Sequence, residues 1–324
     1  MNTKLLTLDD VLAALRTEGC ACGPVNPGEY HAWKPVLEAE LNCPVVSKST
    51  LADFAANPYK FKWEQDNKVR KSSDAMALGS LVDCLTLTPD LFAEQYLCEP
   101  VRVQLKKDGT PYADGRQDPE QKAEWLAKAE DGVHVITEEQ LGRGKAIAKQ
   151  ATQHLERLGL RPGETYTSQV GLWVYLTELG GMKLASPVVV TGMLDVCPTA
   201  GALVDLKTTS VDVSSESKVG YTTEDFHYGL QAALYTDLFQ LCSGEAEPRP
   251  GFVFLFVGTA EPYMSRELRM TNDVLDLYRA EYQRLIRRYA DCWTLDEWGE
   301  PMLAPINYQP SAREFKRLGK EADV

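Results

Sequence analysis

Two aspartates and a lysine are spaced for metal-assisted chemistry in the stretch TGMLDVCPTAGALVDLKTTS, residues 191–210. Asp195 and Asp205 each lie among apolar, β-prone residues, although aspartate is a poor strand former. A three-residue hairpin loop at 199–201, with glycine at the left-handed position, sets Asp195 opposite Asp205. Lys207 then shares their face of the hairpin. We expect the three charged groups to converge on one spot.

Facing carboxylates repel each other, so such a pair needs a shared proton, a positive side chain or a divalent cation. Oxygen ligands of this kind favour magnesium or manganese. A lysine beside the metal would orient or help to deprotonate a water, and would stabilise a phosphorane-like transition state. The spacing alone leaves a second interpretation open, a surface hairpin whose charges face solvent.

The segment after the hairpin predicts a helix over residues 223–242, with Gly244 as its end. Gln231 and Tyr235 are one turn apart on that helix, on the same face as His227. Their amide and phenol could contact a polymer backbone, or they could be ordinary boundary residues.

The elements that must position these residues follow from periodicity and caps. We expect helices at 7–18, from Ser47 or Ser49 to before Pro58, around 78–85, at 120–130, at 137–158 and at 272–292. We expect strands at 167–178, 186–196, 202–209, 251–258 and 263–270, and a polar loop at 100–120. This order predicts a mixed α/β domain with helices packed on a central sheet.

Composition indicates a soluble globular protein, with 44% hydrophobic and 25% charged residues in 324. The net charge of −13 argues mildly against an indiscriminate nucleic-acid coat, but allows a local basic track. Residues 59–73, YKFKWEQDNKVRKSS, hold five basic residues against two acidic ones. They suit a phosphate-facing surface or a solvated loop. A Pro/Gly/Asn-rich connector at 23–35 marks an expected boundary near residue 40.

The eight cysteines are too scattered for a four-ligand zinc or iron–sulfur site. The start of the chain has no signal-peptide pattern, and no apolar run approaches the length of a membrane span. We therefore expect no membrane association, free thiols and a cytoplasmic setting.

The hairpin, followed by YGLQAALYTD at 228–237, resembles the PD-(D/E)XK nuclease superfamily. It is most similar to the RecB-type and exonuclease VIII branch, in which Q-x-x-x-Y follows the catalytic hairpin. The segments VVSKSTLADFAANPYKFK and AMALGSLVDCLTLTPDLF also resemble the opening of exonuclease VIII-like phage and prophage proteins. The resemblance covers about residues 44–300 and implies a restriction-endonuclease-like central mixed sheet flanked by helices.

The resemblance also implies roles for the hairpin and the helix after it. Asp195 and Asp205 would be metal ligands, with the carbonyl of Leu206 as a further oxygen. Lys207 would serve the attacking water. Gln231 would lie near the active site or a DNA phosphate. Tyr235 would contact DNA, by stacking or by supporting that helix.

Other positions match the family less closely. Ser47, Lys48 and Ser49 lie where the related lambda-type exonucleases have residues near the 5′-phosphate, so we expect them to contact DNA. Asp83, in LGSLVDCL, stands where this branch usually has histidine. We interpret Asp83 as a metal ligand, with altered metal preference or weakened activity as consequences. For the usual upstream acid, Glu164 and Glu178 remain open candidates.

We thus expect an accessory segment at 1–40, an exonuclease domain at 41–310 and a tail at 311–324. The resemblance implies a Mg²⁺-dependent exodeoxyribonuclease, with Mn²⁺ as a substitute, that digests duplex DNA ends 5′ to 3′. It would leave a 3′ overhang for a phage-type annealing recombinase in a bacterial host cell. It also implies a ring-shaped homo-oligomer, with basic residues such as 60–71 along the DNA channel.

Three alternatives remain. One is a RecB- or Cas4-like nuclease of other polarity. Those relatives often carry a four-cysteine cluster, whose spacing this chain lacks. Another is a DNA-end-binding protein with a decayed nuclease core, which Asp83 favours and the set of Asp195, Asp205 and Lys207 disfavours. A different metal hydrolase, such as a phosphatase, would need a recognisable ligand cluster, and of the four histidines only His227 is near a plausible site.

Overall fold

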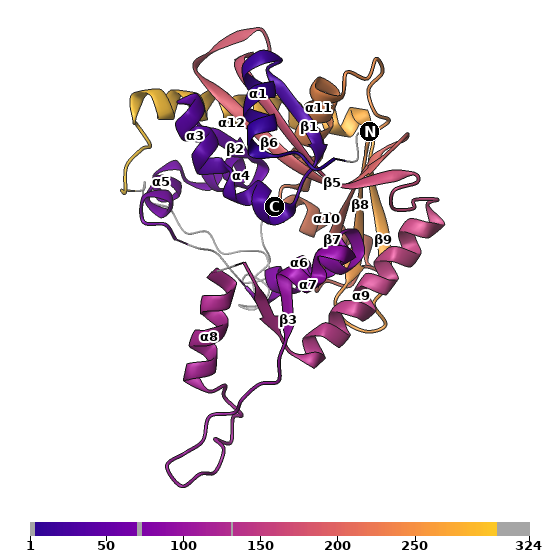
Figure 1. Ribbon diagram of the computed structural model, residues 1–324. Coiled ribbons are helices and arrows are strands. Elements are labelled where there is room, and N and C mark those ends of the chain that lie inside the picture. The colour runs from indigo at the N-terminus through magenta and orange to yellow at the C-terminus, as the bar shows by residue number, and fades with distance from the viewer. Residues whose placement is uncertain (1–3, 70–72, 131, 303–324) are drawn as a thin grey trace, which may run out of the picture.

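The computed structural model describes residues 4–69, 73–130 and 132–302, in which helices pack on both faces of a mixed sheet (Figure 1). The helices are α1 (Leu8–Thr17), α2 (Pro27–Ala32), α3 (Lys34–Leu41), α4 (Lys48–Ala56), α5 (Pro58–Asp66), α6 (Asp74–Leu87), η1 (Pro89–Leu91), α7 (Phe92–Gln95), α8 (Pro119–Glu130), α9 (Glu138–Arg157), α10 (Glu216–Asp225), α11 (Tyr228–Ser243) and α12 (Asn272–Leu295). The strands are β1 (Cys20–Pro24), β2 (Val45–Ser47), β3 (Tyr96–Cys98), β4 (His134–Ile136), β5 (Tyr166–Leu179), β6 (Met182–Pro198), β7 (Leu203–Thr209), β8 (Phe252–Gly258) and β9 (Ser265–Met270).

Seven strands of the described chain form the central sheet, in the order β1-β5-β6-β7-β8-β9, with β2 also paired to β6. The pairs β5–β6 and β8–β9 are antiparallel, whereas β7–β8 is parallel from Leu203↔Phe252 to Thr209↔Gly258. Every residue of β8 is buried, as its continuous apolar run predicts. The predicted architecture, a central mixed sheet flanked by helices, is confirmed.

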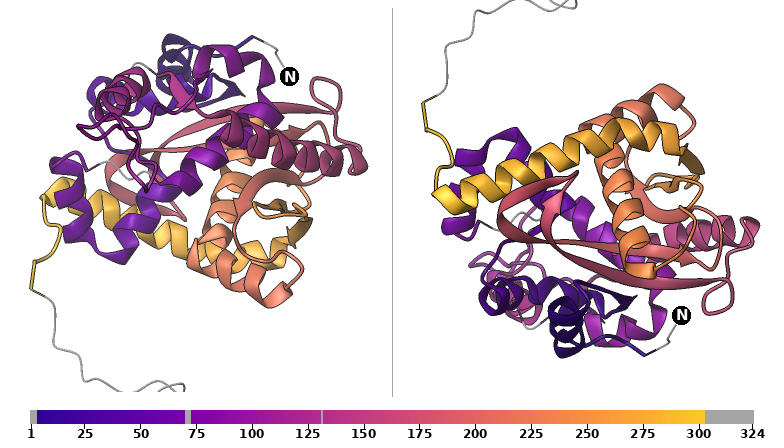
Figure 2. Two further views of the ribbon diagram at one scale, coloured as in Figure 1. Left: turned by 90° about the horizontal axis from the view of Figure 1, so that it is seen from below. Right: turned by 90° about the horizontal axis from the view of Figure 1, so that it is seen from above.

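Different helices cover the two faces of the sheet (Figure 2). α11 and α12 lie over the core that contains Phe254. On the opposite face, α1 and α3 pack around Trp173, and α6 and α9 pack around Leu255. Phe254 and Leu255 belong to different faces because successive strand residues point in opposite directions.

β6 and β7 separate just beyond their hairpin turn. They are paired at Val196↔Val204, whereas β7 stays paired with β8 along its whole length. Further back along β6, strand β2 pairs in parallel, with Ser47 beside Thr191. Because β5 occupies the other edge of β6, β2 and β7 must share one edge and diverge from it. We call the space between β2 and β7 the fork.

Several local predictions are confirmed. Thr7 and Asp10 form the capping box of α1. Ser47, rather than Ser49, caps α4, because its hydroxyl accepts from the N–H of Thr50. Gly244 ends α11 in the left-handed conformation.

Of the two interpretations open for the basic segment at 59–73, the loop does not hold for its first part, because α5 runs to Asp66. Two other local predictions are wrong. The connector at 23–35 holds α2 and the start of α3. The helix expected at 223–242 is broken, because His227 has a φ of 51° between α10 and α11.

The segment at 1–40, expected as an accessory, supplies β1 to the central sheet and α1 to α3 to one face over its described part. The predicted tail at 311–324 lies outside the described residues. Among the described helices none is alone long and apolar enough to cross a membrane. The bent pair of α6 with the helical segment Pro89–Gln95 meets the criteria of length and composition only.

Candidate active site

A cavity of about 290 Å³ lies at the fork, and it gathers the charged residues of the hairpin. Asp195 of β6 and Asp205 and Lys207 of β7 line it, together with Asp83 of α6 and Gln231 of α11. The structure therefore brings together five positions that the sequence predicted to be catalytic or metal-binding. It does so from four elements, of which α6 lies far along the chain from the hairpin of β6 and β7.

Asp195 lies where β6 changes the face to which its residues point. Leu194 belongs to the core under α11 and α12, whereas Val196, two residues on, belongs to the core under α6 and α9. β5 makes the same change at Gln169, whose φ is 51° and which lies between the pairs Ser168↔Val196 and Val170↔Leu194. This paired irregularity turns Asp195 toward the fork instead of letting it follow the regular alternation.

The carboxylate of Asp195 replaces a lost sheet hydrogen bond. Its Oδ2 accepts from the backbone N–H of Leu206 at 2.9 Å, at the point where β7 has left β6. A backbone N–H inside a protein needs an acceptor, and a carboxylate is a strong one. Val196↔Val204 has the register predicted for the hairpin, in which Asp195 is opposite Asp205.

Asp205 is the most enclosed of the acids, with 2% of its surface exposed. Gln231 donates from Nε2 to Oδ1 of Asp205 at 2.6 Å. Lys207 Nζ lies 2.6 Å from Oδ2 as an ion pair. Both carboxylate oxygens of Asp205 therefore have a partner, an amide at Oδ1 and an ammonium group at Oδ2.

Lys207 is held charged by the acids around it. Burial alone would lower the pKa of Lys207, but the nearby carboxylates of Asp205 and Asp195 more than offset burial and raise it. Its Nζ also lies 5.1 Å from the ring centre of Tyr228, which favours the cation. Lys207 is therefore an electrostatic group in this state and not a base.

Asp83 reaches the fork because α6 approaches β7 closely. At Gly79, one turn earlier, a Cβ atom would lie only 3.2 Å from Oγ1 of Thr208. Burial raises the pKa of Asp83 to about 7, with Lys207 opposing and Asp205 adding to the rise. Burial and the charges of Asp205 and Asp83 also raise the pKa of Asp195.

The three carboxylates supply more negative charge than Lys207 balances, which favours a further cation. Their oxygen donors suit a hard divalent ion. In the conformation described, however, no three acidic, histidine or cysteine side chains of the described residues form a ready-made metal cluster. The donor chemistry fits a cation.

The remaining residues of α11 differ in position. Tyr235 lines the fork cavity and packs against β6, where a Cβ on Gly192 would lie 2.6 Å from its ring. Burial raises the pKa of Tyr235, so its phenol stays protonated. His227 is exposed, and it does not line the cavity. Because the helix is broken at His227, this residue does not share the face of Gln231 and Tyr235.

Ser47, Lys48 and Ser49 lie at the end of β2 and the start of α4. Ser47 and Ser49 line the fork cavity, and their hydroxyls are 3.0 Å apart. Lys48 Nζ instead donates to the carbonyl of Phe226 at 2.6 Å and lies 5.2 Å from the ring centre of Tyr228. Burial and the charge of Lys207 lower the pKa of Lys48 to about 8.

Sequence reasoning missed one wall of the cavity. Tyr30 and His31 of α2, Lys34 of α3, and Thr191 of β6 all line it. No spacing could have placed α2 at the hairpin, because its position depends on pairing between β1 and β5. The two candidates for an upstream acid, Glu164 and Glu178, are exposed and do not line this cavity.

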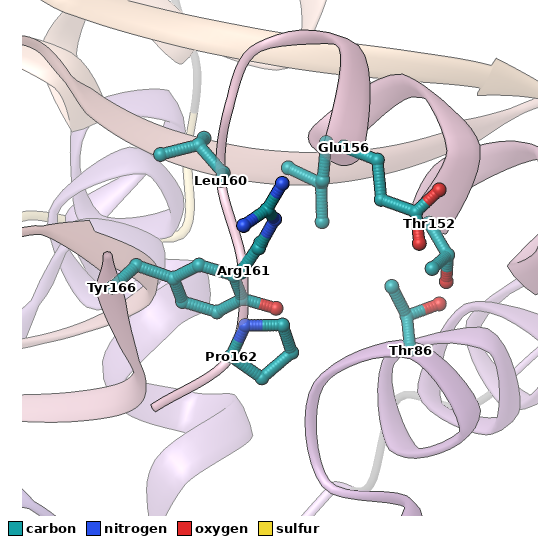
Figure 3. Close-up of a pocket in the computed structure, with 8 residues that line it drawn as sticks. Thr86, Thr152, Glu156, Leu160, Arg161, Pro162 and Tyr166 are labelled. Atoms are coloured by element: carbon teal, nitrogen blue, oxygen red, sulfur yellow. The ribbon is translucent and has the colours of Figure 1, made fainter. Parts of the chain in front are cut away.

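A second cavity, also of about 290 Å³, lies between α6, α9 and the start of β5 (Figure 3). Glu156 is the only carboxylate among its described lining residues, which also include Arg161 and Tyr166. This set lacks the cluster of acids that could hold a divalent cation, so we place the chemistry at the fork.

Most of the chain matches a known protein family. Residues 47–302 match the family model of a PDDEXK-like domain of unknown function (DUF3799). No curated protein matches the chain. Among solved structures, the chain is similar to a "Putative exonuclease" from Eubacterium rectale, with 16% identity and a TM-score of 0.45 over 88% of this chain and 97% of that one. A protein from Vibrio cholerae is more distant, with 13% identity and a TM-score of 0.21 over 91% and 63%.

Proposed function

The chain belongs to the family of this PDDEXK-like domain, within the PD-(D/E)XK nuclease superfamily, and we propose that it is a divalent-metal-dependent exodeoxyribonuclease acting on linear duplex DNA. The observation that carries the proposal is the convergence of Asp195, Asp205 and Lys207 in one cavity at the fork. Family membership supports a nuclease, and the arrangement of these side chains supports phosphodiester hydrolysis.

The proposed ligands of the cation are Asp83, Asp195, Asp205 and the carbonyl of Leu206. In an extended strand the N–H and C=O of one residue point the same way. The Leu206 carbonyl is therefore directed to the same side as its N–H, which bonds Asp195. When bound, a divalent cation supplies Lewis-acid charge that activates water and neutralises the phosphate. We propose Mg²⁺ as this cation, with Mn²⁺ as a substitute.

The side chains of the chain then have distinct tasks. Lys207, charged and beside Asp205, orients the attacking water and stabilises negative charge on the non-bridging phosphate oxygens in the transition state. Gln231 holds Asp205 through its amide, so Asp205 keeps one orientation. Water attacks phosphorus in line and gives up a proton to solvent, the bond from phosphorus to the 3′ oxygen breaks, and that oxygen leaves with a proton from solvent. The product carries a 5′-phosphate.

Further details of the proposal rest on the resemblance to exonuclease VIII-like proteins. They are 5′-to-3′ digestion, a 3′ overhang that an annealing recombinase would use, a homo-oligomeric ring and a cytoplasmic site of action. The position of Ser47 and Ser49 supports the proposal that they contact DNA, because both residues line the cavity. The position of Tyr235 favours a role in packing α11 over a role in stacking on a base, because its ring packs against Gly192.

The test is digestion of linear duplex DNA labelled at one 5′ or one 3′ end, with Mg²⁺, Mn²⁺ or EDTA. Lys207→Met removes the charge, and Lys218→Met is the matched control, because the Lys218 side chain on α10 is exposed. We expect early, metal-dependent loss of the 5′ label in the wild type and the control, and none in Lys207→Met. Early loss of the 3′ label would reverse the polarity.

One observation favours a second candidate function, a DNA-end-binding protein with weak or no catalysis. Asp83 adds a third carboxylate to the cavity, and burial together with Asp205 raises its pKa to about 7 against the opposing charge of Lys207. A partly protonated ligand holds a cation less well. Intact DNA in every metal, with retained binding to DNA ends, would establish this candidate and reject the nuclease.

A further inference from the structure

The fork cavity has a second wall that comes from the segment before residue 41. Tyr30 and His31 of α2 and Lys34 of α3 line the same cavity as Asp195 and Asp205. These three residues precede the part of the chain that matches the nuclease family. The wall therefore belongs to a different part of the chain from the residues that we propose for catalysis.

This wall is fixed to the sheet. β1 pairs with β5, from Cys20↔Val174 to Pro24↔Val170. The phenol of Tyr30 is 2.8 Å from Oγ1 of Thr191, and Thr191 donates in turn to the carbonyl of Leu172. The rings of Tyr30 and Trp33 pack 5.3 and 5.7 Å from Trp173, which is itself almost fully buried. Aromatic packing and hydrogen bonds thus hold α2 in one position.

The charge of this wall is opposite to that of the hairpin. Asp83, Asp195 and Asp205 make one side of the cavity acidic, whereas Lys34 brings an ammonium group to the other side. The contact of Lys34 Nζ with Glu38 is long, at 3.8 Å, and a third of the Lys34 side chain is exposed. The ring of His31 has no hydrogen bond to any described residue, so it can still donate to a ligand.

We propose that Lys34 and His31 bind a phosphate group of the DNA strand that is being cleaved, next to the phosphate held at the carboxylates. This deepens the proposed nuclease function and rests on it. The acidic wall would hold the phosphate that is bound through the metal, and the basic wall opposite would hold the neighbouring phosphate of the same strand. The cavity volume of about 290 Å³ is close to the smallest typical of ligand pockets.

A structural explanation for Lys34 is its ion pair with Glu38, whose Oε1 also accepts from the N–H of Val45. The control must therefore remove a similar ion pair from the same region. Arg16 of α1 is 2.8 Å from Glu40 of α3 and does not line the cavity. Arg16→Met and Lys34→Met both remove one cation that pairs with α3, so a difference between them reports the cavity.

The experiment measures the affinity of the full chain for end-labelled duplex DNA in EDTA, over a range of salt, and kcat/KM with Mg²⁺. We expect Lys34→Met to weaken DNA binding about tenfold and to lower the slope of binding against salt by about one. The fall in kcat/KM should come mainly from a higher KM. His31→Gln should weaken binding by a smaller factor, Lys34→Arg should restore most of it, and Arg16→Met should match the wild type.

Equal affinity and equal salt slope in Lys34→Met and Arg16→Met would overturn the proposal, as would a wild type that binds no DNA. Binding in EDTA does not depend on cleavage, so an inactive wild type that binds DNA would reject the nuclease while this comparison still decides the role of Lys34. Ends with a 5′-phosphate or a 5′-hydroxyl identify the phosphate. A loss confined to phosphorylated ends indicates the terminal group, and an equal loss with both indicates a backbone phosphate.

Discussion

The two edges of β7 are built in different ways. Toward β8 the strand is paired at every residue, and β8 itself is buried throughout. Toward β6 it is paired at Val196↔Val204, and beyond that pair the edge carries Asp205 and Lys207 into a cavity. One edge therefore supplies stability, and the other supplies charged groups with little backbone pairing.

The comparison shows how a sheet can accept charges in its interior. At one position a side chain takes over the hydrogen bond that strand pairing would have made, because Asp195 accepts from the N–H of Leu206. Gln231 donates to the buried carboxylate of Asp205. The acids at the fork repel each other, so the fork lowers stability unless a cation is present, whereas the apolar edge offsets that cost.

The largest expected effect tests the charged edge. Asp195→Asn keeps an oxygen that can accept from Leu206 but removes one of three repelling carboxylates. We expect the rate of DNA hydrolysis to fall by roughly 10⁴-fold, about 5 kcal/mol. The free energy of unfolding in EDTA should be equal to the wild-type value or higher, measured by urea denaturation. A variant that loses stability as well as activity would contradict the division between the two edges.

The next effect tests the apolar edge. Phe254→Ala removes a fully buried ring that stacks on Tyr228 at 5.1 Å. We expect the free energy of unfolding to fall by about 4 kcal/mol. Urea denaturation measures this loss, and single-turnover cleavage of the folded fraction measures the chemistry. Hydrolysis should fall far less than in Asp195→Asn, and an equal fall would show that the two edges are not separable.

The hairpin could be predicted from the sequence because its geometry is local. A short loop ending in Gly201 fixes the register of the two strands, and charged residues two apart on a strand share a face. Helical periodicity and caps located α6, and they located α11 apart from the break at His227. Assigning Asp83 to the site needed the family resemblance, because no local rule connects α6 with β7.

Other features depend on contacts that no local pattern encodes. The change of face at Asp195 requires a matching irregularity at Gln169 on the neighbouring strand. The wall at Tyr30 requires β1 to pair with a strand far along the chain. The break at His227 places a non-glycine residue in the left-handed region, which sequence rules disfavour. Long-range packing imposes each of these.

A smaller effect concerns Lys48, whose Nζ lies 5.2 Å from the ring centre of Tyr228. Its pKa is about 8 in the folded protein, below the ordinary value of 10.5. The folded protein therefore loses this proton at lower pH than the unfolded chain, and stability rises with pH between about 8 and 10.5. Measured by urea denaturation, the free energy of unfolding of the wild type should rise by up to about 3 kcal/mol relative to that of Lys48→Met across this window. If the difference in the free energy of unfolding between the two proteins did not change with pH, the charge of Lys48 would not destabilise the folded protein.

The smallest effect concerns how closely α6 approaches the charged edge. Alanine favours a helix over glycine by up to about 1 kcal/mol, and Gly142→Ala in α9 should show this gain because its Cβ meets no atom within 4 Å. Gly79→Ala should raise the stability by less, because its Cβ would lie 3.2 Å from Oγ1 of Thr208. Either the Thr208 side chain or α6 must then shift. A shift of a few tenths of an ångström at Asp83 should lower the hydrolysis rate several-fold, since catalytic geometry tolerates little displacement. Thermal denaturation and end-labelled cleavage of both variants measure the two quantities. If Gly79→Ala matched Gly142→Ala in both, α6 would not be held against β7 tightly enough to set the position of Asp83.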